Sequence, residues 1–372
     1  MKVCSPVNNL KMLGKRYKND QRPTKKNMNT LQLEMKRKIE RKIIEGVYSF
    51  ESVPCLICNC SSFEVLSEKD RYGLFAPVAI CRSCGLVQAN PRMTQDSYNL
   101  FYNDEYRKLY GGEKKPIEEY FRSQYHRGRN IHEYLKQHNV IKKTVTEIFV
   151  LEIGCSSGGI LLYFKELGCH VRGVDPGEEY INWGVKHYDL DLSVGTIQNI
   201  QNSRSPDIII YSHSLEHMLN PQDELTQVKR IANQDTIVYI EVPGVKYMWN
   251  RYRMDLLLYN ENAHVYHFSL SSLSNLLSKS GFSLVAGDET IRSAWNFVES
   301  VSHNYLIESD YSDAVKYLKR IEVCRRYLSF PRYTVKPLVV ENLKIILKFL
   351  GLFDLAKNIY GKIKSGGWYR FF

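Results

Sequence analysis

Four cysteines occur in two pairs whose spacing suits a single metal ion. Cys55 and Cys58 form one C-x-x-C pair, and Cys81 and Cys84 form a second pair after 22 intervening residues. Each pair directs two thiolates toward one point, and two pairs complete the tetrahedral shell that zinc prefers. Because four thiolates leave no open coordination position, the spacing predicts a structural Zn²⁺ site. The alternative is a set of buried cysteines without a metal.

A glycine-rich turn follows a short apolar run that ends at Ile153. The turn reads Gly-Cys-Ser-Ser-Gly-Gly from Gly154, with Glu152 just before it, and the next apolar run ends in Asp175. Gly154 permits a close approach of backbone to ligand, and a carboxylate such as Asp175 can accept both hydroxyls of a ribose. Glu152 would repel a pyrophosphate but attract an ammonium group, which favours S-adenosylmethionine over a dinucleotide. The alternative is a tight strand–helix turn without a ligand. The predicted cofactor-binding residues are Glu152, Gly154, Cys155, Ser156, Gly158, Asp175, Pro176, Ser212 and His213.

Three histidines are candidates for acid–base chemistry. His213 and His217 follow the apolar run at 207–212, and His264 lies in a later segment. Methyl transfer from a sulfonium requires a base only when the acceptor must lose a proton, and histidine is the natural base near neutral pH. Glu216 could orient a neighbouring imidazole. We predict His217 and His264 as the preferred catalytic pair, with Glu216 and His213 as further catalytic candidates. For each histidine the alternative is a purely structural role.

The elements that would position these residues follow an alternating pattern. Over the 372 residues, apolar runs alternate with amphipathic stretches from about residue 147 onward, which predicts a parallel sheet with crossover helices. Such sheets bind ligands at the carboxyl ends of their strands, so the turn and Asp175 fall on one edge. The predicted strands are 148–153, 169–174, 190–194, 207–212, 236–241, 282–287 and 295–301, and the predicted helices are 158–167, 177–187, 221–232 and 270–280.

These motifs resemble those of the class I S-adenosylmethionine-dependent methyltransferases. The stretch LEIGCSSGG matches the first motif of the family, Asp175 matches its ribose-binding acid, and the segment 206–221 contains the family's Leu-Glu-His followed by Pro221. A later segment, 262–270 with Leu276 and Gly281-Phe282, matches as well. The resemblance covers about residues 50–300 and implies a Rossmann-like α/β fold with a seven-stranded sheet whose last strand is antiparallel. Ser156 stands where many members have a second glycine.

The cysteine pairs together with the following Gly-Leu-Val-Gln-Ala-Asn-Pro resemble the N-terminal zinc-binding module of bacterial sugar and polysaccharide methyltransferases. In that group the module helps to cover the substrate cleft. The sugar C-methyltransferases carry Tyr-His-Glu-His, whereas this chain has Glu261-Asn-Ala-His264, with Ala263 in place of the glutamate. The resemblance therefore implies methyl transfer to a hydroxyl, or to a carbon, of a sugar, nucleotide sugar or surface-glycan precursor.

Charge is distributed unevenly along the chain. Residues 1–46 and 311–372 each hold 13 Lys+Arg against 4 Asp+Glu, whereas 47–310 holds 25 against 32. The lysine-bearing helix predicted over 341–364 either packs on the body or lies at a membrane surface. We expect no nucleic-acid partner because the body is acidic, and the N-terminus shows no apolar signal segment. From these features we expect a cytoplasmic protein. Its contact with the inner face of the membrane, if any, would be peripheral. The alternatives are a zinc-containing RNA methyltransferase and a non-catalytic cofactor-binding protein.

The predicted organisation has five parts. They are a basic tail and helix (1–46), a zinc-ribbon module (47–92), a helical linker or substrate cover (93–145), the methyltransferase domain (146–305) and a basic helical C-terminal extension (306–372).

Overall fold

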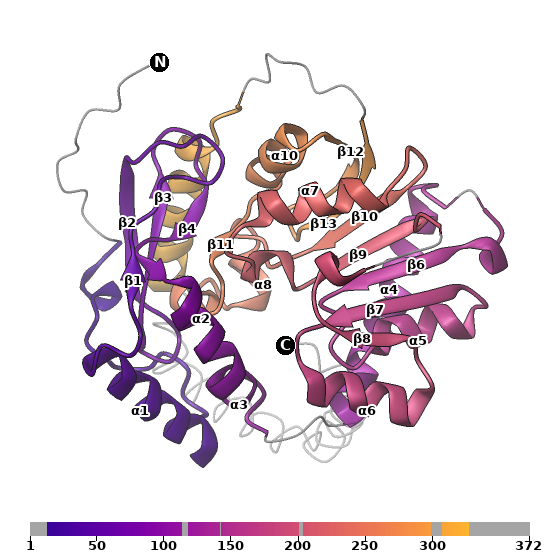
Figure 1. The fold of residues 1–372 in the computed structure, drawn as a ribbon. Coiled ribbons are helices and arrows are strands. Elements are labelled where there is room, and N and C mark those ends of the chain that lie inside the picture. Colours follow the sequence, from indigo (N-terminus) through magenta and orange to yellow (C-terminus); the bar gives the residue numbers. More distant parts are fainter. Residues whose placement is uncertain (1–12, 114–117, 142, 201–203, 299–306, 327–372) are drawn as a thin grey trace, which may run out of the picture.

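A computed structural model describes residues 13–113, 118–141, 143–200, 204–298 and 307–326 (Figure 1). The helix predicted over 341–364 lies outside these residues. Within the described part of the chain, no helix combines the length and the apolar content needed to cross a bilayer.

The larger part of the molecule is built on a seven-stranded sheet in the order β12-β13-β10-β9-β6-β7-β8. The strands are β6 (Phe149–Ile153), β7 (His170–Asp175), β8 (Leu192–Val194), β9 (Ile208–Ser212), β10 (Ile237–Glu241), β12 (Phe282–Gly287) and β13 (Arg292–Phe297). Neighbours pair in parallel except that β13 is antiparallel to both β10 and β12. The seven predicted strands and the antiparallel last strand are confirmed.

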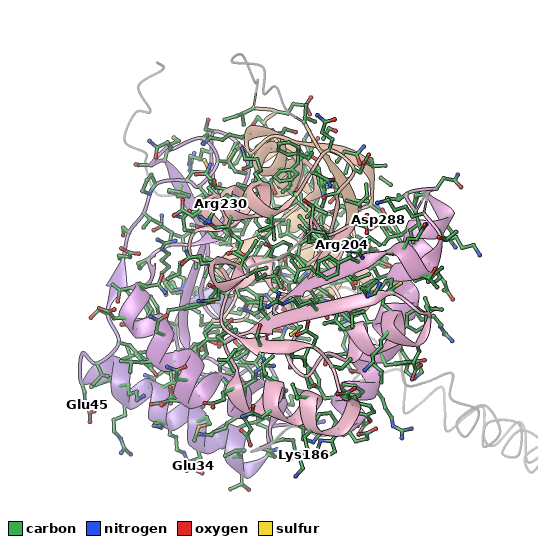
Figure 2. The ribbon with its side chains drawn as sticks, turned by 45° about the vertical axis from the view of Figure 1, so that its right-hand side comes forward. Glu34, Glu45, Lys186, Arg204, Arg230 and Asp288 are labelled. Carbon is green, nitrogen blue, oxygen red and sulfur yellow. The ribbon has the colours of Figure 1, made fainter. Side chains whose placement is uncertain are left out.

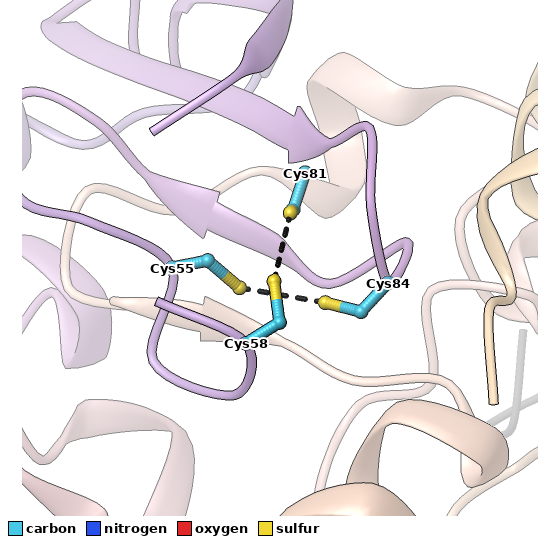
Figure 3. Close-up of side chains that lie close together, drawn as sticks. All are labelled: Cys55, Cys58, Cys81 and Cys84. Carbon is cyan, nitrogen blue, oxygen red and sulfur yellow. Dashed lines mark hydrogen bonds between the residues drawn. The ribbon is translucent and has the colours of Figure 1, made fainter. Parts of the chain in front are cut away.

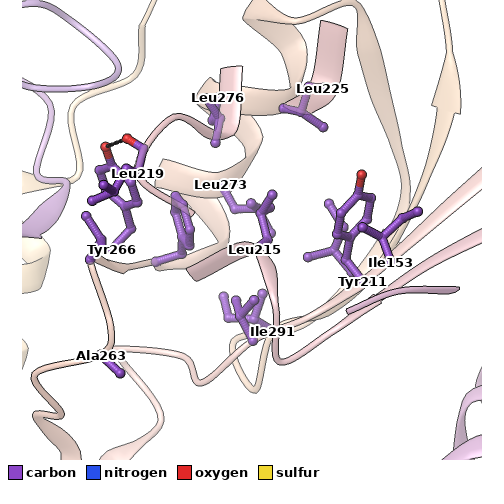
Figure 4. Close-up of a cluster of buried hydrophobic side chains, with 14 of the residues drawn as sticks. Ile153, Tyr211, Leu215, Leu219, Leu225, Ala263, Tyr266, Leu273, Leu276 and Ile291 are labelled. Carbon is purple, nitrogen blue, oxygen red and sulfur yellow. Dashed lines mark hydrogen bonds between the residues drawn. The ribbon is translucent and has the colours of Figure 1, made fainter. Parts of the chain in front are cut away.

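Helices cover both faces of this sheet because strand side chains point alternately to the two sides. Val150, Ile208 and Ile210 pack into one buried cluster with the helices α4 and α5, while Leu151, Ile209 and Tyr211 pack into another with α7 and α10. Figure 4 shows part of the second cluster, including Leu225 of α7, Leu276 of α10 and Tyr211 of β9. The covering helices are α4 (Glu118–Gln137), α5 (Gly159–Glu166), α6 (Glu178–Tyr188), α7 (Pro221–Ile231) and α10 (Leu270–Lys279).

The N-terminal part of the chain forms a second unit beside the large sheet (Figure 1). Its central feature is a four-stranded sheet in the order β11-β4-β3-β2, in which β11 (Tyr266–His267) comes from the segment that follows the catalytic candidates. Tyr266 pairs with Gln88 and His267 with Val87. The two units therefore share a sheet, which the division predicted at residue 92 did not foresee.

The remaining elements are short or lie in the N-terminal unit. The strands are β1 (Phe50–Glu51), β2 (Phe63–Lys69), β3 (Phe75–Cys81), β4 (Val87–Ala89) and β5 (Arg92–Met93), and the α-helices are α1 (Thr30–Ile44), α2 (Gln95–Phe101), α3 (Arg107–Gly111), α8 (Met248–Arg251) and α9 (Leu256–Tyr259). A π-helical segment, Tyr102–Tyr106, joins α2 to α3 without a break. Four 3-10 turns are Lys15–Tyr17, Val145–Glu147, Ile197–Asn199 and Leu215–His217.

A further helix, residues 311–326, packs against one face of the small sheet. Ala314 and Leu318 are buried with Val78 and Ile80 of β3. This contact ties the chain beyond residue 306 to the N-terminal unit.

Charged side chains such as Glu34, Lys186 and Arg230 point outward from their helices, as Figure 2 shows.

Candidate active site

The four predicted metal ligands converge on one point in the N-terminal unit (Figure 3). The Sγ atoms of Cys55 and Cys84 are 3.4 Å apart, those of Cys58 and Cys81 are 3.5 Å apart, and all four lie within 4.8 Å of one another. A tetrahedral zinc ion with metal–sulfur distances of about 2.3 Å has sulfur–sulfur edges of roughly 3.8 Å. The donor set therefore fits a tetrahedral metal ion.

A glycine shapes the second cysteine turn. Gly85 follows Cys84 with a φ of +83°, and its N–H donates to the carbonyl of Cys81. A Cβ at this position would lie 2.5 Å from the backbone nitrogen of Tyr311. The turn that presents Cys81 and Cys84 thus depends on glycine for its backbone conformation. It also depends on glycine for its close packing against the helix of residues 311–326.

The glycine-rich turn joins β6 to α5 at the carboxyl edge of the large sheet. Gly154 and Ser156 have φ values of +78° and +52°, and a Cβ on Gly154 would lie 2.7 Å from Cβ of Ser214. The N–H groups of Gly154 and Cys155 both donate to the carbonyl of Val174, at 2.8 and 3.1 Å. These bonds hold the turn against the end of β7, next to Asp175.

Asp175 ends β7 as a buried carboxylate. Its Oδ2 accepts from the N–H of Ser156 at 2.9 Å, its Oδ1 accepts from the N–H of Gly177 at 2.7 Å, and Nη2 of Arg107 lies 3.7 Å from Oδ1. Each carboxylate oxygen can accept more than one hydrogen bond, so capacity remains for ribose hydroxyls. Pro176 follows it as an exposed residue before α6.

Several polar atoms along this edge are buried without a hydrogen-bond partner among the described residues. They include Oε2 of Glu152, Oγ of Ser156 and Oγ of Ser212. Burial raises the pKa of Glu152 well above its usual value, although the charge of Arg127 opposes the rise. Buried polar groups in native proteins are nearly always paired. The unpaired atoms around the turn therefore mark a place where a polar ligand belongs.

The predicted catalytic residues gather beyond the end of β9. His213 has a φ of +54°, and its ring nitrogens lie 3.5 Å from Glu216 Oε1 and 3.7 Å from Glu241 Oε1. Burial and Arg127 act to lower the pKa of His213, but the two carboxylates outweigh them and the pKa is raised. His213 is thus favoured as an imidazolium, which leaves it poorly suited to accept a proton.

His217 and His264 lie side by side, with ring centroids 4.7 Å apart. Burial lowers the pKa of His217, and burial followed by the charge of His217 lowers the pKa of His264 well below its usual range. Both imidazoles are therefore neutral at neutral pH. Glu216 Oε1 lies 3.7 Å from Nε2 of His217. The structure brings together the preferred pair and the glutamate.

The tautomer of His217 follows from its contact with a backbone carbonyl. Its Nδ1 lies 3.0 Å from the carbonyl oxygen of Ala263 and 2.6 Å from the Tyr102 hydroxyl. Because a carbonyl can only accept, the Ala263 contact favours the tautomer with the proton on Nδ1 and the lone pair on Nε2, in which the Tyr102 hydroxyl accepts from the same N–H. Nε2 is thus the atom of His217 that can accept a proton or a metal ion.

Four tyrosines next to the histidines were not predicted from the sequence. They lie on the continuous helical stretch that runs from α2 to α3. Tyr98, Tyr102, Tyr106 and Tyr110 are spaced by four, and the hydroxyl of Tyr98 reaches the carbonyls of His217 and Ala263 at 2.7 and 2.6 Å. The spacing of four is the signal that could have found them. The π-helical turn in this stretch is typical of functional sites.

Arg107 was also missed. Its guanidinium lies 4.3 Å from the centre of the Tyr180 ring as well as near Asp175. A cavity of about 250 Å³ opens here, and its lining comprises Tyr106, Arg107, Tyr110, Gly111, Glu113, Tyr120 and Tyr180. An aromatic cavity with one cation therefore adjoins the predicted ribose-binding carboxylate.

Comparison with known proteins identifies the large unit. Residues 123–286 match the family model described as a methyltransferase domain. A probable (S)-tetrahydroprotoberberine N-methyltransferase of Papaver bracteatum is 26% identical over 100 residues, which are 25% of this chain and 28% of that protein. The ubiquinone biosynthesis O-methyltransferase of Maricaulis maris is 30% identical over 90 residues, 22% of this chain and 35% of that protein. The chain thus spans about a third or less of the length of these relatives.

One solved structure similar to this chain is the 1,6-didemethyltoxoflavin-N1-methyltransferase of Burkholderia thailandensis, which was determined with S-adenosylhomocysteine bound. It is 15% identical, with a TM-score of 0.39, and the match covers 60% of this chain and 96% of that one. Residues 123–286 of this chain match a methyltransferase domain, and the chain has a Rossmann-like α/β fold with a seven-stranded sheet.

Proposed function

We propose that the protein transfers a methyl group from S-adenosylmethionine to a hydroxyl of a sugar, nucleotide sugar or glycan precursor. The observation that carries the proposal is the row of unpaired buried polar atoms around the turn after β6, beside the carboxylate of Asp175. When bound, the cofactor supplies an electrophilic methyl group attached to a good leaving group.

The residues of the turn divide the work of holding the cofactor. Asp175 would accept from the ribose hydroxyls, and Gly154 and Gly158 would admit the ligand to the backbone. Glu152 is suited to the ammonium group, because a cation beside this buried carboxyl favours its ionised form. Arg127 acts electrostatically on Glu152, His213 and Glu241, so it is suited to the carboxylate end of the methionine moiety.

His217 is our candidate for the base. Its Nε2 has the free lone pair, burial keeps the ring neutral, and the Ala263 carbonyl fixes its orientation. The proton of an acceptor hydroxyl would pass to Nε2 as the oxygen attacks the methyl group. His264 lies close enough to hydrogen-bond the same acceptor, whereas the imidazolium form of His213 is suited to holding Glu216 and Glu241 in place.

The tyrosine-lined cavity supports a sugar-containing acceptor. Aromatic rings pack against the apolar faces of sugars and bases, and the Arg107 guanidinium suits a phosphate or carboxylate. A nucleotide-linked sugar carries all of these groups. The mildly acidic body argues against a bare nucleic-acid chain as the acceptor.

We further propose that the four cysteines hold one structural zinc ion. The sulfur–sulfur distances support this assignment, and the closed set of four ligands leaves no position for a substrate. The site would join the turn before β2 to the turn after β3, and β3 pairs with β4, which in turn pairs with β11. Zinc would therefore stabilise the small sheet, whose strand β11 begins two residues after His264.

The test is an assay of the full-length protein with S-adenosylmethionine and a panel of nucleotide sugars. We expect one member to gain a methyl group while S-adenosylhomocysteine accumulates in equal amount, and His217→Asn to lower kcat strongly without abolishing cofactor binding. Methylation of RNA in place of every sugar, or cofactor binding without turnover on any hydroxyl-bearing acceptor, would contradict the proposal.

A further inference from the structure

The carboxylate of Glu216 is the most anomalous buried group near the histidines. Its side chain is 2% exposed, and neither of its oxygens has a hydrogen-bond partner among the described residues. Ring nitrogens of His213 and His217 lie 3.5 Å and 3.7 Å from Oε1, beyond the 2.7–3.2 Å that is usual for a hydrogen bond. The His213 imidazolium offers one positive charge at 3.5 Å, but both carboxylate oxygens still lack the hydrogen-bond donor or cation that a buried polar group requires.

A second cluster of potential metal ligands surrounds this carboxylate. One ligand atom each from Glu216, His217 and His264 lies within 4.8 Å of the other two. Ligand atoms bound about 2.1 Å from one ion are necessarily separated by about 3–4 Å. The 3.7 Å between Glu216 Oε1 and Nε2 of His217 is therefore too long for a hydrogen bond but suitable for two ligands that share an ion.

The state of His217 fits metal ligation as well. A histidine ligand must be neutral, and it usually donates its second N–H to a carbonyl or carboxylate that fixes the ring. The Nδ1–H of His217 donates to the Ala263 carbonyl, which leaves Nε2 facing Glu216. The second ring nitrogen of His217 is thus already arranged as in known metal sites.

We propose that Glu216, His217 and His264 bind one divalent transition-metal ion, separate from the four-cysteine site. Two imidazoles and one carboxylate suit Mn²⁺, Fe²⁺, Co²⁺ or Zn²⁺ and leave coordination positions open. An ion held there would bind oxygen atoms of the acceptor and lower the pKa of a hydroxyl, which favours acceptors with two neighbouring oxygens. This consequence rests on the proposed function, whereas the binding itself does not.

Metal binding and proton acceptance by His217 exclude each other, because both use the lone pair on Nε2. With the ion bound, its effect on the hydroxyl replaces the histidine as the means of removing the proton, which then passes to water. Methyl transfer by the intact protein would in that case stop when the ion is removed. His217 acting as the base would instead leave transfer unaffected by a chelator that spares the cysteine site.

The direct test uses Mn²⁺, a hard ion that the cysteine site disfavours. The full-length protein is titrated with Mn²⁺ while the electron paramagnetic resonance signal of the free ion is followed. We expect one Mn²⁺ per chain, and at least tenfold weaker binding for Glu216→Gln. Glu224→Gln is the matched control: Glu224 accepts a hydrogen bond from the Tyr211 hydroxyl, as a glutamine also would, and its variant should bind Mn²⁺ like the original protein.

A measurement on the unmodified chain keeps the test decisive if Glu216→Gln does not fold. Pulsed resonance of the bound Mn²⁺ should reveal coupling to nitrogen atoms of histidine rings. Absence of Mn²⁺ binding at millimolar concentration, together with only one zinc per chain after incubation with excess zinc, would overturn the proposal. So would bound Mn²⁺ without nitrogen coupling.

Calorimetry with S-adenosylmethionine on the same samples separates the two proposals. Cofactor binding and methyl transfer by a chain that binds no metal beyond the zinc of the cysteine site would refute the second metal site alone. Mn²⁺ binding to a chain that does not bind the cofactor would refute the proposed function alone.

Discussion

The cofactor edge and the histidine cluster meet at the same end of the large sheet, but the chain builds them in different ways. The cofactor edge comes from two consecutive strands and the turn between them, held by bonds such as that from the Ser156 N–H to Asp175. The histidine cluster is assembled over long distances, since Tyr102 contacts His217 across 115 positions of the sequence. Local chemistry therefore specifies the cofactor side, whereas the fold as a whole specifies the acceptor side.

The largest effect is expected at the cysteine site, where we propose a structural zinc ion. Cys81→Ser should remove the zinc and lower the free energy of unfolding by at least about 4 kcal/mol, because structural zinc contributes folding energy directly. Metal analysis and urea unfolding measure the two effects. Zinc-free protein with an unchanged unfolding curve would contradict the prediction. It would show that the sheet containing β11 does not need the metal for its stability.

Removal of the proposed base should sharpen the contrast between the two sides. His217→Asn should lower kcat by about 10²- to 10⁴-fold, because it removes the lone pair on Nε2. Its affinity for S-adenosylmethionine should stay within about twofold, since the turn after β6 is untouched. Steady-state kinetics with calorimetry provide the measurement. A similar loss of cofactor affinity would mean that the two sides are not separable.

Protonation of Glu241 provides a pH test at the junction between the two sides. Burial would raise the pKa of Glu241, but the nearby His213 imidazolium lowers it to about 2. A lowered folded-state pKa stabilises the protein above the unfolded value of about 4.3, and this contribution disappears as the pH falls toward 2. Glu241→Gln should cost about 2–3 kcal/mol at pH 7 and progressively less in acid.

The raised pKa of His213 has the opposite consequence. Its stabilising contribution is present below the unfolded value of about 6.5 and is lost as the pH rises through the higher folded value. Unfolding curves of the original protein and Glu241→Gln across the pH range would reveal both trends. A difference between the two proteins that does not change with pH would show that the pair is not ionised.

The smallest effect is expected for the tyrosine above the base. Tyr102→Phe removes the hydroxyl 2.6 Å from Nδ1 of His217 but keeps the ring that packs against Tyr106. The loss of one hydrogen bond corresponds to about 1 kcal/mol, or roughly fivefold in kcat. The Ala263 carbonyl still holds Nδ1, so the pH profile of kcat should shift only slightly. An inactive variant would assign this tyrosine a direct chemical role.

The sequence predicts the large sheet well because its strands are buried apolar runs separated by amphipathic helices. It places the last strand too late, at 295–301 instead of Arg292–Phe297. The apolar residues Val298 and Val301 extend the expected run toward the C-terminus, whereas the actual register pairs Arg292 with Glu241 of β10. Pairing between distant strands decides such boundaries.

The acceptor side was harder to predict for the same reason. The three histidines were identified, but a two-residue strand such as β11 has no periodic pattern, so the shared sheet could not be foreseen. The contacts of Tyr102 and Arg107 also depend on how the helices α2 and α3 lie across the sheet edge. Residue type suggested the chemistry, and only the fold supplied the partners.

The most direct test of the cofactor assignment is a calorimetric titration of the protein and its Asp175→Ala variant with S-adenosylmethionine, with Asp191→Ala as an exposed control. We predict saturable binding to the original protein and the control, and a loss of about 1–3 kcal/mol, roughly 5- to 150-fold, for Asp175→Ala. Equal affinity of all three proteins, or no binding to any of them, would contradict the account.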